Sequence, residues 1–125
     1  MSGIKYLLDT NFILGLLKSQ AEILVEIQQL KLTAGQCAYS AVTRMELLGF
    51  TGISRDEETL IRHKLARLTY LPITTAVEDV AISLRQSRKI KLPDAVIAAT
   101  ALCAGLQLLT QDAHLKSVIA STGEI

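Results

Sequence analysis

Short apolar runs alternate with helical sequence along the whole chain, and this alternation restricts the fold more than any other feature. Four apolar runs predict strands: Ile4–Leu8, Gln36–Tyr39, Tyr70–Ile73 and Leu106–Leu109. The stretches between them predict helices over Thr10–Lys18, Ala21–Leu30, Ser40–Leu48, a segment whose first turn holds Asp56–Glu58, Thr75–Arg88, Asp94–Ala104 and Asp112–Ala120. Strands separated by helices pair in parallel through crossover connections. The sequence therefore predicts an α/β fold with three layers, α/β/α, around a central parallel sheet of four to five short strands.

Among the predicted helices, Asp94–Ala104 is the most apolar. Pro93 suits its first helical position and Gly105 its C-terminal cap. Between them, Asp94 and Thr100 are almost the only polar side chains. A helix that is apolar all round is usually buried, so this one is expected inside the protein.

Two other helices carry an apolar stripe that is expected to face the core. The inward residues are Ile23, Leu24, Ile27 and Leu30 in one, and Leu60, Ile61, Leu65 and Leu68 in the other. Cys37 and Cys103 also lie in apolar stretches, with no Cys or His at ligand spacing, and are predicted to be buried free thiols. A disulfide or a zinc site has little support.

Composition sets the class of protein. With 50% hydrophobic and 20% charged residues the chain is globular, and its 125 residues are expected to form a single domain over 1–125. No apolar run approaches the ~18 residues of a membrane helix. The run Ile4–Leu8 is too short for a signal peptide, so a cytoplasmic location is expected. The net charge of +1 says little about nucleic acid, and the basic clusters Arg55–Arg67 and Arg85–Lys91 are either solvated faces or RNA contacts.

Four acidic residues stand in or beside apolar sequence: Asp9, Glu46, Asp94 and Asp112. Asp9 follows the first strand and Asp112 comes shortly after the last, so both are expected at the carboxyl edge of the sheet, where open α/β sheets bind ligands. At about 5 Å, two carboxylates repel by roughly 3 kcal/mol at an effective dielectric near 20. A converging cluster must therefore take up protons or bind cations, and oxygen ligands without His or Cys favour Mg²⁺ or Mn²⁺.

Each of these acids also has an ordinary structural interpretation. Asp9 and Asp112 suit helix N-caps, and Asp94 suits a first turn, where an anion complements the helix dipole. Glu46 could face solvent or pair with an arginine, Arg44 or Arg85. The neighbouring hydroxyl and amide residues are usually caps or turn residues as well: Thr10, Asn11, Ser40, Thr43 and Thr110.

Taken together, the motifs resemble one family. They are Leu8-Asp9-Thr10-Asn11, Ser40-x-x-Thr43-x-x-Glu46-Leu47, Leu92-Pro93-Asp94-Ala95-x-Ile97-Ala98-Ala99-Thr100-Ala101 and Thr110-x-Asp112. From Ile4 to about Val118 the chain resembles the PIN-domain family, and within it the VapC-type toxins of bacterial type II toxin–antitoxin systems. The first and third motifs are fairly specific, whereas the other two are weak alone.

The resemblance implies a single PIN-like domain that acts as a Mg²⁺-dependent endoribonuclease. Asp9 and Asp94 would be the principal metal ligands, and Glu46 and Asp112 would complete the acidic pocket directly or through water. The resemblance further implies that three polar residues orient the carboxylates or a water: Asn11, Thr43 and Thr110.

The same resemblance implies a homodimer, an RNA substrate and an antitoxin that covers an apolar groove. The segments Phe12–Leu17 and Ile23–Leu30 are the candidates for that groove, with packing in the core as the alternative. The chain departs from the family pattern after Asp112, where Ala113, His114 and Leu115 replace a further polar or acidic residue followed by Phe. Any second metal site that relies on this extra acid is therefore in doubt. Because the sequence ends at Ile125, the final edge strand is expected to be short or missing. His114 is either a surface residue or a contact to metal or phosphate.

Two other functions compete with a nuclease. A phosphotransfer or signalling module shares this size and layering, but an aspartyl phosphatase needs a second Asp where this chain has Asn11. A non-catalytic PIN-like binding protein is the other alternative, which the presence of all four acids disfavours.

Overall fold

The computed structural model, which describes residues 3–122, consists of short strands separated by helices. The strands are β1 (Tyr6–Leu8), β2 (Cys37–Ser40), β3 (Thr69–Leu71) and β4 (Gln107–Leu109). The helices are α1 (Thr10–Leu17), α2 (Ala21–Leu30), the short 3₁₀ helix η1 (Ala34–Gln36), α3 (Ala41–Leu48), α4 (Arg55–Leu65), α5 (Thr75–Ser87), α6 (Leu92–Ala104) and α7 (Ala113–Thr122). The predicted alternation is confirmed, with boundaries within a few residues of the expected ones.

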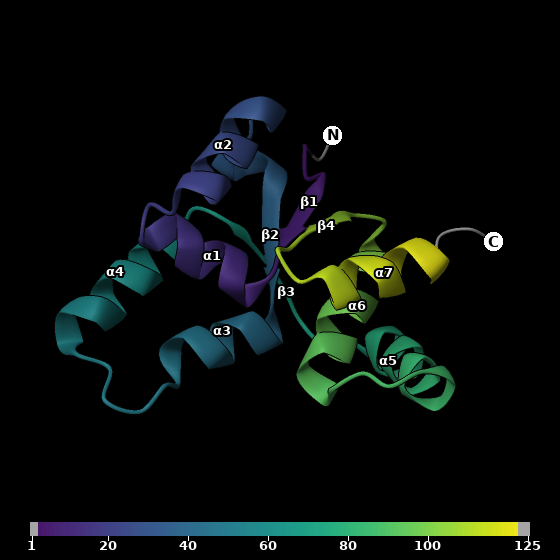
Figure 1. Ribbon diagram of the computed structural model, residues 1–125. Coiled ribbons are helices and arrows are strands. Elements are labelled where there is room, and N and C mark those ends of the chain that lie inside the picture. The colour runs from purple at the N-terminus through teal and green to yellow at the C-terminus, as the bar shows by residue number, and fades with distance from the viewer. Residues whose placement is uncertain (1–2, 123–125) are drawn as a thin grey trace.

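All strand pairings are parallel, and the strands stand in the order β3-β2-β1-β4. Helices α1, α2 and α4 cover one face of the sheet and α5, α6 and α7 the other (Figure 1). The prediction of a three-layer α/β/α fold is therefore confirmed. The described part of the chain contains four strands, and residues 123–125, where a final edge strand would continue, lie outside it.

Alternate strand residues enter two separate hydrophobic cores, because successive side chains point to opposite faces of a sheet. In β1, Leu7 belongs to the core beneath α5, α6 and α7, and Leu8 to the core beneath α1 and α2. Leu108 and Leu109 of β4 divide in the same way. Full burial of each such leucine stabilises the fold by about 1.5–3 kcal/mol, so both cores hold the central strands in register.

The strand order creates one crevice at the carboxyl edge of the sheet. From β1 the chain moves outward to β2 and β3, and then returns to place β4 on the other side of β1. The boundary between β1 and β4 is thus the topological switch point, where ligands bind in open α/β sheets. Leu8 pairs with Leu109, and the Asp9 N–H donates to the Leu109 carbonyl over 3.2 Å. The residues that follow these two strands therefore start side by side at the crevice.

Helix α6 is buried through most of its length, as its composition predicts. Pro93 lies in its first turn, and Gly105 ends it with a φ of 67° that favours glycine. The prediction for Cys103 is wrong, because the last turn of α6 reaches the surface and exposes this thiol. Cys37 is a buried free thiol as predicted, and burial raises its pKa to about 11.

The inward stripes of α2 and α4 are narrower than predicted. Ile23 and Ile61 are buried, but Leu24 is 43% exposed and Leu60 is 54% exposed. Both helices belong to an outer layer and present only one edge to the sheet, so the residue beside the buried one stays at the surface. No helix within residues 3–122 is long and apolar enough to cross a membrane.

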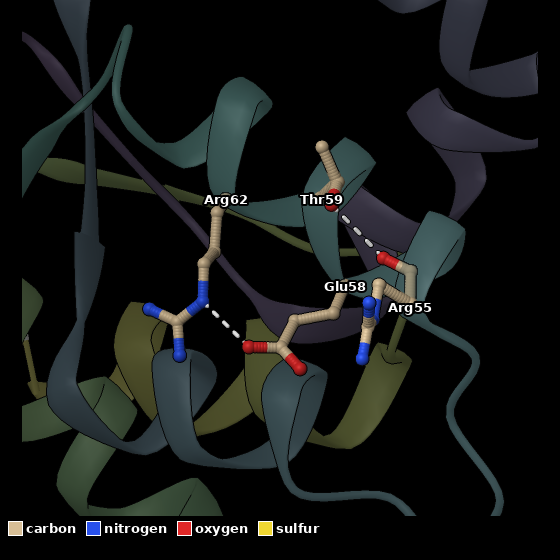
Figure 2. A network of polar contacts seen from close by, with 4 residues as sticks. All are labelled: Arg55, Glu58, Thr59 and Arg62. Carbon is tan, nitrogen blue, oxygen red and sulfur yellow. Dashed lines mark hydrogen bonds and ion pairs between the residues drawn. The ribbon is translucent and has the colours of Figure 1, made fainter.

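The basic cluster Arg55–Arg67 begins on the outer face of α4. Arg62 Nε donates to Glu58 Oε2 over 2.8 Å, and the Thr59 hydroxyl donates to the Arg55 carbonyl over 2.9 Å (Figure 2). Exposed pairs of this kind contribute about 0.3–0.5 kcal/mol. The geometry agrees with a solvated helix face, which was one of the two interpretations of this cluster.

Gly15 marks the close approach of α1 to α2 and gives a test of the packing. A Cβ added there would lie 2.6 Å from Ile23 Cγ1. Because Ile23 is fully buried, Gly15→Ala is expected to lower the free energy of unfolding by about 1–3 kcal/mol in urea denaturation, despite the better helix propensity of alanine. Gly35→Ala is the control, since a Cβ there meets nothing within 4 Å. An unchanged midpoint for Gly15→Ala would contradict this packing.

Candidate functional site

Asp9 is buried where β1 ends, and both of its carboxylate oxygens are engaged. Oδ1 accepts a hydrogen bond from the Phe12 N–H over 2.7 Å, which makes Asp9 the N-cap of α1. Oδ2 accepts a hydrogen bond from the hydroxyl of Thr110, which follows β4. Only 4% of Asp9 is exposed, so these two donors fix its direction in a site with little water.

Asp112 stands next to this pair at the start of α7. Its backbone N–H donates to Thr110 Oγ1 over 3.0 Å, and its Oδ1 accepts from the Leu115 N–H over 3.1 Å. The capping interpretations of Asp9 and Asp112 are therefore correct, and the caps themselves bring both carboxyl groups to the end of the β1–β4 pair. Capping and membership of a shared acidic cluster do not exclude each other here.

Glu46 reaches the same region from α3, a helix that packs against α1, α4 and α6. Its Oε1 accepts a hydrogen bond from the Thr10 hydroxyl over 2.6 Å. Thr10 Oγ1 also lies 3.0 Å from the Oγ1 of Thr43, which is fully buried. Within residues 3–122 the one ion pair joins Arg62 and Glu58, so the alternative of an arginine partner for Glu46 is wrong.

The charge of Asp94 interacts with its acidic neighbours. Partial burial raises the pKa of Asp94 above its ordinary value, and the negative charges of Asp112 and Glu46 raise it further. Lys91 and His114 lower the pKa of Asp94, because a positive charge favours the ionised carboxylate. Asp94 thus lies between the acidic cluster and a basic rim formed by Lys91 and His114.

Asp9 belongs to the same electrostatic cluster. Burial is the largest cause that raises its pKa and outweighs the hydrogen bonds from Thr110 and Phe12, which lower it. The charges of Asp112 and Asp94 raise the pKa of Asp9 further. All four acidic residues are therefore linked by mutual repulsion, although they come from four separate parts of the chain.

The four acids do not form a ready-made metal site. Among the described residues no three His, Cys, Asp or Glu side chains are already placed to hold one ion. The pKa effects act over longer distances than coordination bonds, which for hard cations measure about 2.0–2.6 Å. The carboxylates are therefore within electrostatic range of one another without forming a preassembled ligand shell. Their chemistry fits a hard divalent cation, because the cluster offers oxygen donors and an excess of negative charge.

The remaining candidate residues differ in their surroundings. Asn11 is exposed in the first turn of α1, and within residues 3–122 its side chain has no hydrogen-bond partner. His114 is a surface residue whose Nε2 lies 2.9 Å from the Lys89 carbonyl oxygen. The sequence predicted Thr10 only as a cap or turn residue, and it placed Lys91 in a basic cluster without indicating its closeness to Asp94. The contact between Thr10 and Glu46 joins residues 36 positions apart, for which one sequence offers no signal.

An apolar groove opens beside the acidic cluster, between α1, α3 and α4. It has a volume of ≈ 460 Å³, and its lining includes Leu14, Leu17, Leu47, Phe50 and Leu60 together with Glu46. The segment Phe12–Leu17 thus contributes to a groove as well as to the core. No residue of Ile23–Leu30 lines this groove, because α2 packs on the other side of α1.

Comparison with known proteins gives a consistent result. The sequence matches the family model described as the PIN domain over residues 6–120, whereas no curated protein matches it significantly. Similar solved structures include a toxin–antitoxin complex from Klebsiella pneumoniae, with 30% identity, 86% of this chain and 87% of that chain covered, and a TM-score of 0.75. FitAcB from Neisseria gonorrhoeae has 24% identity, coverage of 92% and 93%, and a TM-score of 0.75. DNA-bound VapBC from Salmonella typhimurium has 20% identity, coverage of 91% and 91%, and a TM-score of 0.74. At these last two identities the likeness concerns the fold.

Proposed function

Because this chain belongs to the PIN-domain family, we propose that it is a metal-dependent endoribonuclease and the toxin of a toxin–antitoxin pair. The observation that carries the proposal is the group of four carboxylates near the end of the β1–β4 pair. The charges of Asp112 and Asp94 raise the pKa of Asp9, and those of Asp112 and Glu46 raise the pKa of Asp94. The similarity to a toxin–antitoxin complex at 30% identity supports the toxin assignment. We further propose that residues 1–125 form a single PIN-like domain and that the protein acts in the cytoplasm.

Asp9 and Asp94 are the proposed principal ligands of Mg²⁺ or Mn²⁺, and Glu46 and Asp112 complete the pocket directly or through water. A bound divalent cation supplies a Lewis acid that lowers the pKa of water and stabilises the oxygens of a phosphodiester during in-line displacement. Ions of this kind also offset the repulsion among the four carboxylates, which supports their assignment as the cofactor.

The chain's own residues hold the carboxylates in position. Thr110 and the Phe12 N–H each bind one oxygen of Asp9, so this carboxylate has a fixed direction before any cation arrives. Asn11 stands where an aspartyl phosphatase needs its second Asp, which disfavours that alternative. Asn11 at the exposed start of α1 and Thr43 beneath Thr10 are proposed to orient water or the neighbouring acid.

The basic rim is the proposed RNA contact. Lys91 and His114 lie within electrostatic range of Asp94, and the cluster Arg85–Lys91 begins in the last turn of α5. Positive charge at this border attracts RNA phosphates toward an acidic cluster that would otherwise repel them. Few aromatic side chains are present for base stacking, so backbone shape and charge are proposed to carry recognition.

Two protein partners are proposed. The apolar groove that ends at Glu46 suits a segment of a cognate antitoxin, which would cover the groove and the acidic pocket together. A homodimer is proposed through the face of α5 and α6, where Ile82 and Leu92 are exposed. Glu78 and Arg85 flank Ile82 on α5, so a two-fold axis at Ile82 would bring each glutamate toward the arginine of the second copy.

Incubation of the purified protein with transfer, ribosomal and messenger RNA is expected to give discrete cleavage products in Mg²⁺ or Mn²⁺. Excess chelator is expected to abolish cleavage, and added Mg²⁺ to restore it, because the carboxylates need the cation's charge. Denaturing gel electrophoresis of end-labelled RNA measures the products. Cleavage that persists in chelator, or no cleavage of any of the three RNA classes with either ion, would reject the proposed activity.

A further inference from the structure

A chain of hydroxyl groups leads from the start of α3 to the carboxylate of Glu46. The Ser40 hydroxyl is 3.4 Å from Thr43 Oγ1, Thr43 Oγ1 is 3.0 Å from Thr10 Oγ1, and the Thr10 hydroxyl is 2.6 Å from Glu46 Oε1. Ser40 and Thr43 are fully buried. This row of hydroxyl groups therefore starts at buried residues and ends at the exposed side chain of Glu46.

The hydrogen bonds in this chain can run in only one direction when Glu46 is ionised. A carboxylate only accepts, so the single hydroxyl proton of Thr10 goes to Glu46. The contact between Thr10 and Thr43 must then use the Thr43 proton, and Thr43 receives its own hydrogen bond from Ser40. The Ser40 oxygen in turn accepts from the Thr43 N–H over 3.1 Å, a cap that belongs to α3 itself. Every hydroxyl proton of Ser40, Thr43 and Thr10 is thus directed toward Glu46.

We propose that Thr10 is a positioning residue that holds the Glu46 carboxylate over the acidic cluster. The proposal rests on the proposed metal-dependent activity and extends it. Glu46 is exposed, and fixing such a long side chain in one direction costs rotamer entropy. The charge of Asp94 also repels it, so an unanchored Glu46 turns toward solvent. Thr10 directly follows Asp9, and its hydroxyl therefore ties Glu46 on α3 to the helix that Asp9 caps.

Thr10→Val tests this role, because valine keeps the shape of threonine but cannot donate. The expected result is a 10- to 100-fold weaker apparent affinity for Mn²⁺, measured from the metal-dependent thermal shift, with a matching loss of RNA cleavage. Thr10→Ser is expected to restore both to within a few-fold of the parent, since it retains the hydroxyl. The matched control is Thr100→Val, because the buried Thr100 hydroxyl donates only to the Val96 carbonyl within α6. This control is expected to keep the metal affinity of the parent even if its melting temperature falls.

A double-mutant cycle separates positioning from general stability. If Thr10 acts through Glu46, Thr10→Val is expected to have little further effect on Mn²⁺ affinity in a Glu46→Gln background. Additive effects, or a Thr10→Val protein with the Mn²⁺ affinity of the parent, would overturn the proposal. Crystal structures of the parent and Thr10→Val without metal provide a readout that needs neither ion nor RNA. An unchanged direction of Glu46 in the variant would also overturn it, whereas a displaced Glu46 in a protein that cleaves no RNA would reject only the nuclease function.

Discussion

Asp94→Asn is expected to abolish metal-dependent RNA cleavage, with a loss on the order of 10³-fold or more, while the protein remains folded. The amide has nearly the same shape as the carboxylate but lacks the negative charge that a hard cation requires. The N-cap of α6 is Lys91, and no capping hydrogen bond depends on the Asp94 side chain. Folding should therefore survive, because the substitution also removes repulsion from Asp112 and Glu46. Cleavage rates and circular dichroism of the parent and variant measure the two effects separately.

Asp79→Asn is the matched control, since Asp79 is an exposed acid on α5 that takes no part in the acidic cluster. It is expected to cleave RNA at the rate of the parent. Asp9→Asn should lose activity as Asp94→Asn does, and asparagine can still cap α1 through its side-chain oxygen. The amide nitrogen would face Thr110, however, and could not accept the hydrogen bond that the Thr110 hydroxyl donates to Asp9, so a stability loss of about 1 kcal/mol is expected as well. More than a tenth of the parental rate in Asp94→Asn would contradict a metal-binding role for this residue.

The layered fold could be predicted from the sequence because local patterns determine it. Strand and helix periodicities, the capping position of Gly105 and the apolar composition of α6 are all short-range features. The meeting of Asp9 and Asp112 also follows from the pattern, since residues after parallel strands emerge at one edge of the sheet. The adjacency of β1 and β4 that makes them neighbours depends on the strand order, which the sequence left open.

Side-chain exposure and long-range contacts depend on how whole helices pack, and they could not be predicted from a single sequence. The exposure of Leu24, Leu60 and Cys103 follows from the position of each helix at the edge of a layer rather than from its periodicity. The hydrogen bond between Thr10 and Glu46 depends on the packing of α3 against α1. The basic border of Asp94 was partly visible in the charge cluster at the end of α5, but its contact with the acid was not.

The metal-free protein is expected to lose stability as the pH rises, and a divalent cation is expected to restore it. Asp9 and Asp94 have folded-state pKa values raised above the ordinary 3.8, so between that value and the raised pKa the folded state binds more protons than the unfolded state. The free energy of unfolding therefore falls as the pH increases through this window. Glu57 acts in the opposite direction, because its hydrogen bonds with Ser54 lower its pKa. The contribution of the acidic cluster to the pH dependence of stability is therefore best measured as a difference between the parent and a variant that lacks one of the acids.

Asp94→Asn provides that difference in thermal and urea denaturation. Solvent screens a partly exposed group, so without metal the variant should gain at most about 1 kcal/mol at pH 7, and its stability should depend less on pH than that of the parent. At a cation concentration about 100 times the dissociation constant, the parent should gain about 2.7 kcal/mol. The variant should gain much less at the same concentration, because one proposed ligand has lost its charge. Two proteins with parallel pH profiles and equal stabilisation by Mg²⁺ or Mn²⁺ would show that Asp94 does not share a cation site with the other acids. Activity could then not be attributed to a metal held by these carboxylates, even if RNA were cleaved.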